Sequence, residues 1–272
     1  MTMHRIALVG WHVFKESVRD RVLYGIGAFA VLLIGASLLI GQITAGQDLK
    51  IIKDLGLAAI ELAGVLMTVF IGVGLVAREI DRRSIFSLLA KPLPRWEFIL
   101  GKYVGLVLTV AVNIWAMTAA LYLMLGWLYL ASPANLRLAW EAPALDPRIA
   151  VQVVLITAEL ALLTAIALFF STFSSSAIIS VVFTVSLYVL GLASADLRGF
   201  NDIVDAPPAI GHLVSAIGWM VPAFSAFDVK SSVVHGHPIS PGLVGSMTLY
   251  SLIYSVTLLG AAVALFSRRE FK

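Results

Sequence analysis

The residues of this chain that could do chemistry are few and widely spaced. Glu159 and Asn113 each lie about ten residues inside a long apolar run, so both would sit about 15 Å deep if those runs cross a membrane as helices. A carboxylate at that depth costs at least a few kcal/mol unless it is neutralised or paired. We therefore predict a hydrogen bond between Glu159 and Asn113, which would serve either helix–helix adhesion or the lining of a substrate path.

A second candidate is the pair His235-Gly236-His237, with His212 upstream. A His-x-His pair can bind copper or zinc. Two histidines make an incomplete site, however, and the chain contains no cysteine to complete it. An ordinary loop is the preferred interpretation, and no metal site is predicted. The lack of cysteine also excludes a disulfide framework and thiol catalysis.

The sequence motifs that usually mark enzymes are missing. No G-x-x-x-x-G-K-[ST] phosphate loop occurs, so the chain is not predicted to bind ATP in the usual way. Neither an H-E-x-x-H pair nor a G-x-S-x-G elbow occurs. A membrane enzyme would need a converging set of polar residues, and the sequence offers none. We predict a protein that is not an enzyme and holds no cofactor of its own.

The composition indicates that most of the chain lies in a lipid bilayer. Of the 272 residues, 60% are hydrophobic and only 13% are charged, and the mean hydropathy is +0.97. A water-soluble fold would expose large apolar patches at this composition, whereas a lipid bilayer accommodates them. The pI of about 9.2 does not indicate nucleic-acid binding, because the basic residues lie between the apolar runs, where they set membrane orientation.

The apolar runs predict an all-α fold with a single transmembrane domain over residues 1–272. Ala209–Phe227 could be taken as a seventh span, but it is short and contains Pro222. We prefer a re-entrant or interfacial hairpin there, within an outer segment 196–242. The six predicted spans are Val22–Ile40, Gly56–Ala77, Tyr103–Leu130, Ile149–Ser171, Ala177–Ala195 and Leu243–Phe266.

The distribution of Lys and Arg predicts the orientation. Thirteen of the 19 fall on one side of the six spans, and cytoplasmic loops carry such an excess. Both termini are therefore predicted to be cytoplasmic. The thirteen are Arg5, Lys15, Arg19, Arg21, Arg78, Arg82, Arg83, Lys91, Arg95, Lys102, Arg268, Arg269 and Lys272.

The segment before the first span is predicted to be an amphipathic helix at the membrane surface. Within residues 3–20, apolar or small residues recur at helical spacing, and charged residues occupy most of the remaining surface. Such a helix lies in the interface with its apolar face in the lipid. The alternative is that residues 3–20 are an ordinary segment that precedes the first span and has no role of its own. The stripe consists of Ile6, Val9, Val13, Phe14 and Ser17.

The cytoplasmic loop from Arg78 to Lys102 is the richest polar segment. Glu79 and Arg83 are four residues apart, as a stabilising pair on a helix should be. Apolar residues follow, and Pro92 and Pro94 end the helix. A short charged helix with an exposed apolar tip suits docking into a groove of another protein. The alternative is an ordinary loop with the positive charge of the cytoplasmic side.

This stretch, EIDRRSIFSLLAKPLPRWEFILGK from Glu79 to Lys102, resembles the coupling-helix region of type-2 ABC exporter permeases. The similarity extends to the N-terminal helix and the six spans. Within the permeases, the chain looks most like the branch that includes the permease of copper-enzyme (nitrous oxide reductase) maturation transporters. That likeness is carried by Pro222-Ala223-Phe224, Phe227-Asp228-Val229-Lys230, Val233-Val234-His235-Gly236 and Phe266-Ser267-Arg268-Arg269-Glu270-Phe271.

The resemblance implies a permease subunit of an exporter in the bacterial plasma membrane. Its partners would be two copies of a cytoplasmic ABC ATPase, which carries ATP and Mg, and a second permease chain, identical or homologous. The coupling helix would lie within residues 79–95. The residues expected to dock the ATPase are Glu79, Asp81, Arg82, Arg83 and Phe86.

Two other functions stay open at this point. The chain could be an ABC-type assembly or maturation factor acting on a periplasmic partner, a reading that is compatible with the branch it resembles. It could also be a secondary transporter that uses Glu159 to couple an ion gradient, although no inverted repeat is evident in the sequence.

Overall fold

The computed structural model describes residues 2–43, 48–81, 94–138, 140–174, 176–200, 204 and 207–268. Every regular element within these ranges is a helix, which confirms the all-α prediction. The helices are α1 (Thr2–Val18), α2 (Arg21–Ile43), α3 (Asp48–Asp81), α5 (Arg95–Ala131), α6 (Ala134–Leu138), α7 (Arg148–Phe173), α8 (Ala177–Leu192), α9 (Ser194–Arg198), α11 (Pro208–Met220), the 3-10 helix η1 (Phe224–Phe227), α12 (Lys230–His235) and α13 (Pro241–Arg268).

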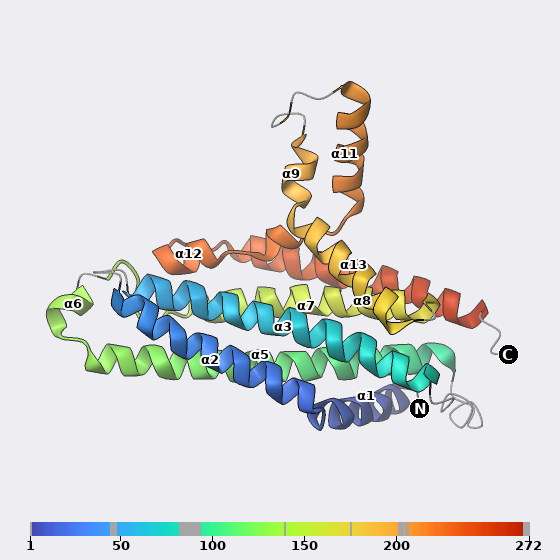
Figure 1. Cartoon of the computed structure of the whole chain (residues 1–272), viewed down its shortest axis with the longest axis horizontal. Coiled ribbons are helices and arrows are strands. Elements are labelled where there is room, and N and C mark those ends of the chain that lie inside the picture. Colours follow the sequence, from blue (N-terminus) through green and yellow to red (C-terminus); the bar gives the residue numbers. More distant parts are fainter. Residues whose placement is uncertain are drawn as a thin grey trace.

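Five of these helices are long and apolar enough to cross a membrane: α2, α3, α5, α7 and α13. They lie side by side along the long axis of the molecule (Figure 1). The predicted span at Ala177–Ala195 is a 16-residue helix, α8, which is shorter than a full crossing. A sixth crossing would require the bent pair formed by Ala209–Met220 and Phe224–His235, whose two parts meet at 49°.

The two ends of the bundle are formed by different helices. Helix α1 and the last turn of α13 lie at one end, which we call the α1 end (Figure 1). Helix α6, helix α12 and the first turn of α3 lie at the opposite end, which we call the α6 end. Helix α1 and the end of α13 therefore lie at the same end of the bundle.

Helix α7 forms the centre of the bundle. It packs against α3, α5, α8 and α13, and 72% of its apolar window is buried. Leu155, Ile156, Leu162 and Leu163 are fully enclosed. An apolar helix that is surrounded by other helices in this way needs no polar face. Because burying a polar side chain costs free energy, the polar residues of α7 are the ones to inspect for a function.

Helix α1 packs against the start of α5 through glycines. A Cβ added at Gly105 would lie 2.5 Å from the Gly10 carbonyl oxygen and 2.8 Å from Cβ of Val13, and one added at Gly101 would lie 2.6 Å from Cβ of Val9. Small residues four apart allow two helix backbones to approach closely. The predicted apolar stripe of α1 thus faces α5, and its position at the membrane surface stays a prediction.

We expect Gly105→Ala to destabilise the protein by about 1–3 kcal/mol, because the added methyl group would force α1 away from α5. The midpoint of thermal unfolding in mild detergent measures this loss. Gly25→Ala on α2 is the matched control, since a Cβ there meets no atom within 4 Å. An equal midpoint for the two variants would contradict the close packing of α1 on α5.

The 196–242 segment divides into two parts with different surroundings. Helices α9 and α11 form a hairpin that projects sideways from the bundle (Figure 1). By contrast, η1 and α12 lie on the bundle, where Phe224, Phe227 and Val233 are at most 1% exposed. The predicted hairpin is therefore one exposed pair of helices followed by a buried return, and only the return can contribute to a site inside the bundle.

Candidate functional site

Glu159 lies in the middle of α7 with only 2% of its surface exposed. The predicted hydrogen bond to Asn113 does not form, because the Asn113 amide donates to the Thr109 carbonyl of its own helix at 2.8 Å. The Oε1 atom of Glu159 has no hydrogen-bond partner among the described residues. The depth of both side chains could be predicted from residue counts, whereas the rotation of the two helices about their axes could not.

The groups that do face Glu159 come from three other elements. Tyr188 on α8 is a polar neighbour of both Glu159 and Glu61, which is on α3, and the charges of Lys230 and Asp228 also act on Glu159. Tyr188 is 9% exposed. A row of polar side chains therefore leads from the α12 region into the centre of the bundle.

The middle of this row is an ion pair between distant parts of the sequence. The Lys230 ammonium donates a hydrogen bond to Glu61 Oε2 at 2.8 Å and lies 3.3 Å from Asp228 Oδ2. The Glu61 and Lys230 side chains are 14% and 17% exposed. The pair fixes α12 against α3, and Gln152 on α7 adds a second anchor by accepting a hydrogen bond from the Val229 N–H at 2.9 Å.

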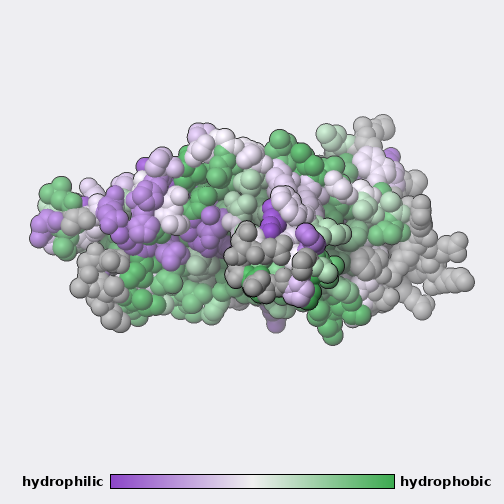
Figure 2. All heavy atoms as spheres, turned by 90° about the horizontal axis from the view of Figure 1, so that it is seen from above, coloured by the Kyte–Doolittle hydropathy of each residue, from purple (hydrophilic) through white to green (hydrophobic). Residues whose placement is uncertain are grey.

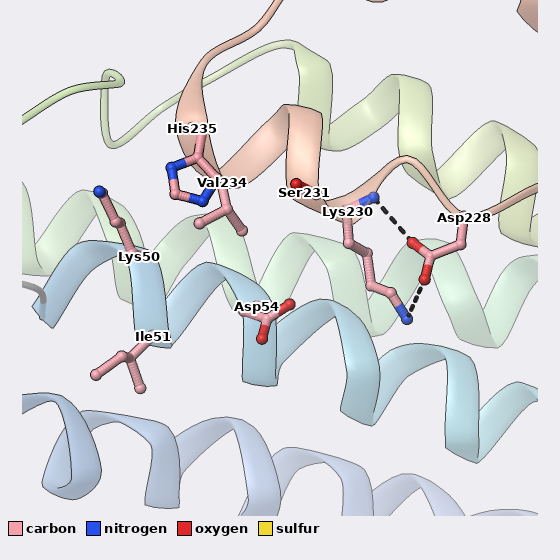
Figure 3. Close-up of a pocket in the computed structure, with 8 residues that line it drawn as sticks. All are labelled: Lys50, Ile51, Asp54, Asp228, Lys230, Ser231, Val234 and His235. Atoms are coloured by element: carbon pink, nitrogen blue, oxygen red, sulfur yellow. Dashed lines mark hydrogen bonds and ion pairs between the residues drawn. The ribbon is translucent and has the colours of Figure 1, made fainter.

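A pocket of about 460 Å³ opens next to this pair, between α3 and α12. Figure 3 shows Lys50 and Asp54 on the side of α3 that faces α12, which carries Lys230 and follows Asp228, while the Ile51 side chain points the other way. Figure 2, which looks down from above on the molecule of Figure 1, shows hydrophilic residues gathered toward the α6 end, while hydrophobic residues are frequent over the rest of this face. The pocket thus lies beside the outer end of the row, where Asp228 and Lys230 line it, and Glu61, Tyr188 and Glu159 are not among its lining residues.

A second charged group, at the α6 end, is almost wholly buried. The Lys53 ammonium donates a hydrogen bond to the Pro143 carbonyl at 2.8 Å and lies 3.8 Å from Asp146 Oδ2. Lys53 is 0% exposed and Asp146 is 1% exposed. Asp146 also accepts hydrogen bonds from the Arg148 backbone N–H at 2.9 Å and from its guanidinium at 3.2 Å. This group holds the segment before α7 against α3.

The predicted histidine pair lies beside these charges. His235 Nδ1 is 3.5 Å from Glu141 Oε2, and the His235 and His237 rings are 6.0 Å apart. His212 is on α11, in the projecting hairpin. No three His, Asp or Glu side chains in the described part of the chain are placed to hold a metal ion. The Lys50 ammonium at 2.7 Å and then His235 lower the pKa of Glu141 by hydrogen bonding.

The predicted docking residues lie at or beyond the limit of the described chain. Glu79 and Asp81 belong to the last turn of α3, while Arg82, Arg83 and Phe86 fall outside the described residues. Their role stays a prediction.

The structure does describe the flank of the predicted dock. Arg5 of α1 lies 3.9 Å from Glu97 at the start of α5, and Glu97 is 1% exposed. Helix α1 is thus tied by charge, as well as by its glycine contacts, to the element that follows the predicted docking loop.

Lys53, Asp146, Lys230 and Tyr188 were not among the predicted site residues, although they make the polar contacts inside the bundle. One sequence signal could have pointed to the face of α3 that lies next to these residues. Lys50, Asp54 and Glu61 are spaced at i, i+4 and i+11, which places them on one face of a helix. The predicted span began at Gly56, so the first two were assigned to a loop.

The fold and the composition define a class: a polytopic α-helical membrane protein whose polar residues are gathered inside the bundle and at its ends. The family model described as ABC-2 family transporter protein matches residues 7–271. The chain therefore belongs to the ABC-2 transporter family, whose members are membrane components that work with a separate ATPase. None of the curated proteins matches the chain.

Proposed function

We propose that this chain is the membrane-spanning permease subunit of an ATP-driven exporter, coupled to a cytoplasmic ABC ATPase through residues 79–95. The observation that carries the proposal is the family match over residues 7–271. The arrangement of the bundle supports it, because the end of α3 and the start of α5, which flank the predicted docking loop, share the α1 end with α1 and the end of α13. The segments that carry thirteen of the 19 Lys and Arg adjoin these same helices in the sequence. The α1 end is the cytoplasmic one in this proposal.

Two permease chains, identical or homologous, would assemble with two ATPase subunits in the bacterial inner membrane. Both termini would be cytoplasmic, and the α6 end would face the outside. ATP binding would close the ATPase pair, and the chain from Glu79 to Ala90 would transmit that movement to α3 and α5. ATP can drive this shift only to the extent that it binds the two states with different affinity.

We expect the double charge reversal Arg82→Glu/Arg83→Glu to remove most of the ATPase that co-purifies with the permease from native membranes in mild detergent. The physical reason is that two cations of the proposed dock would become anions facing the same partner surface. The measurement is the molar ratio of ATPase to permease, together with the ATP hydrolysis of the purified product.

The matched control is Arg19→Glu/Arg21→Glu, which makes the same charge change in the connection between α1 and α2. This control should keep its ATPase. If both double variants retain the ATPase, the dock lies elsewhere. If no ATPase accompanies the unaltered chain under several gentle conditions, the permease proposal fails, and a transporter driven by an ion gradient takes its place.

A second proposal concerns the use of the ATP-driven movement. The pieces that resemble the branch serving nitrous oxide reductase maturation include η1 and α12, and α12 lies at the α6 end, which is the outer side in this proposal. A partner in the periplasm could then receive the movement instead of a solute. Cross-linking from a photoreactive residue at the exposed Ser240 tests this, since a maturation factor should capture one periplasmic protein reproducibly.

A further inference from the structure

Helices α9 and α11, which we call the arm, leave the bundle halfway along one of its membrane-spanning helices. The Tyr254 hydroxyl donates a hydrogen bond to the carbonyl of Met220, the last residue of α11, at 3.1 Å. The Ala223 N–H, just beyond the arm, donates to the Tyr250 hydroxyl at 3.2 Å. Tyr250 and Tyr254 are the tenth and fourteenth of the 25 residues over which α13 is apolar enough to cross a membrane. The base of the arm is therefore at mid-membrane depth.

From this base the arm runs across the long axis of the bundle (Figure 1). If the long helices cross the membrane, that direction lies in the plane of the bilayer, so the arm stays near the depth of its base. Helix α11 has 13 residues and is about 20 Å long. Among the described elements it packs mainly on α9. The bundle of the same chain therefore leaves most of α11 uncovered.

The two helices of the arm are held firmly to each other. The Arg198 guanidinium donates a hydrogen bond from Nε to the Gly218 carbonyl at 2.9 Å, and it lies 4.6 Å from the centre of the Trp219 ring. A Cβ added at Gly218 would lie 2.9 Å from the Arg198 backbone nitrogen, so the helices touch at this glycine. The arm thus offers a fixed surface to whatever covers it.

Lipid alone does not suit this surface. Asp196 and His212 are exposed on the arm, and Arg198 is partly exposed. Ionisable side chains in the hydrocarbon core are costly, and they almost always face protein or a water-filled cavity. Since the bundle of the same chain does not supply that environment, a second protein chain must do so.

We propose that the arm packs on a second copy of this chain, and that two copies exchange their arms across a twofold axis. A twofold pair uses the same surfaces twice, so each copy covers the arm of the other. The inference rests on the proposed permease function, in which two permease chains work together, and it names the surface that joins them.

The apolar area of the arm is large enough for such a pair. Five of its apolar side chains are between 40% and 79% exposed. At on the order of 200 Å² for a complete large side chain, they leave roughly 600 Å² uncovered on each arm. Two arms, with an equal area of the surfaces that they cover, exceed the about 1,600 Å² of a standard stable interface. The five are Ile210, Leu213, Ile217, Trp219 and Met220.

The first test replaces Leu213, which is 63% exposed on α11, by the photoreactive residue p-benzoylphenylalanine. The full-length chain is irradiated in native membranes that also contain a copy with a different tag. We expect an adduct of twice the mass of the chain that carries both tags. The matched control has the same residue at Leu32, which is 70% exposed on α2, on the side of the bundle away from the arm (Figure 1). This control should give no such adduct.

The second test removes apolar contact area from the arm. We expect Leu213→Ala/Met220→Ala to weaken the association of two copies about tenfold, because both side chains would lie in the interface. The measurement is the dissociation constant, from energy transfer between two differently labelled copies diluted in mild detergent. Leu32→Ala/Leu39→Ala removes two side chains of similar exposure from α2, 70% and 66%, and should associate like the unaltered chain.

Cross-linking from Leu213 to lipid alone, or to a protein other than this chain, would overturn the proposal. An arm variant that associates as tightly as the α2 variant would overturn it as well. If the arm variant does not fold, the cross-linking result decides. Neither test involves the ATPase, so a chain that keeps its ATPase but does not cross-link through the arm retains the permease function and loses only this interface.

Discussion

Asp146→Asn will lower the free energy of unfolding by about 3 kcal/mol. The substitution keeps an oxygen that can accept the Arg148 N–H hydrogen bond but removes the charge 3.8 Å from the Lys53 ammonium. Lys53, which is 0% exposed, would then be a buried cation held by the Pro143 carbonyl and facing the positive guanidinium of Arg148. Unfolding of the purified protein in rising SDS measures the loss.

The double variant Lys53→Met/Asp146→Asn supplies the control for this interpretation. Replacing a buried ion pair as a whole is often close to neutral, whereas breaking it is not. The double variant should therefore be more stable than Asp146→Asn alone, which gives a clear coupling energy in a double-mutant cycle. Asp54→Asn, the same change at an exposed position on α3, should have little effect. Additive losses at Lys53 and Asp146 would show that the two charges do not interact.

Glu159→Gln will stabilise the protein by about 1 kcal/mol and abolish its function. The stabilisation follows because a carboxylate in the centre of a membrane bundle costs free energy, and Glu159 has one oxygen without a partner among the described residues. The loss of function follows if the row from the pocket to Glu159 needs that charge. The measurements are SDS unfolding of the purified variant and complementation of a deletion strain.

The adhesion hypothesis predicts the opposite result. If Glu159 serves only to hold helices together, Glu159→Gln would keep full function and Glu159→Leu would destroy folding. Glu141→Gln, the same change at an exposed carboxylate of the α6 end, should alter neither stability nor complementation. A Glu159→Gln variant that is both less stable and fully functional would therefore exclude a role for Glu159 in the path.

The membrane-spanning helices could be predicted because apolar run length is a local property. Five of the six predicted spans correspond to helices that meet the length and hydropathy of a crossing. The boundaries were harder, since α3 begins at Asp48, eight residues before the predicted start at Gly56. Lys50 and Lys53 were placed in a loop because charges are costly in lipid. The structure avoids that cost by burying Lys53 against Asp146, which is 93 residues away in the sequence.

The partners of the buried polar residues could not be predicted for a related reason. Depth along a helix follows from residue count, and it was enough to single out Glu159. Which neighbour a side chain meets depends on the rotation of each helix and on chain segments far away in sequence. Lys230 reaches Glu61 across 169 residues, through the return of η1 and α12 onto the bundle. No local pattern indicated that return.

The shortness of α8 has a consequence for the membrane around the protein. Sixteen residues give a helix about 24 Å long, which is about 6 Å less than the hydrocarbon thickness of a typical bilayer. Many of its residues are exposed, among them Ile178, Val182 and Val189. If α8 crosses the bilayer with this face toward lipid, the bilayer beside it must become thinner to match it, and this hydrophobic mismatch has an energetic cost. In that case, a movement that changes the tilt of α8 would also change the energy of this mismatch.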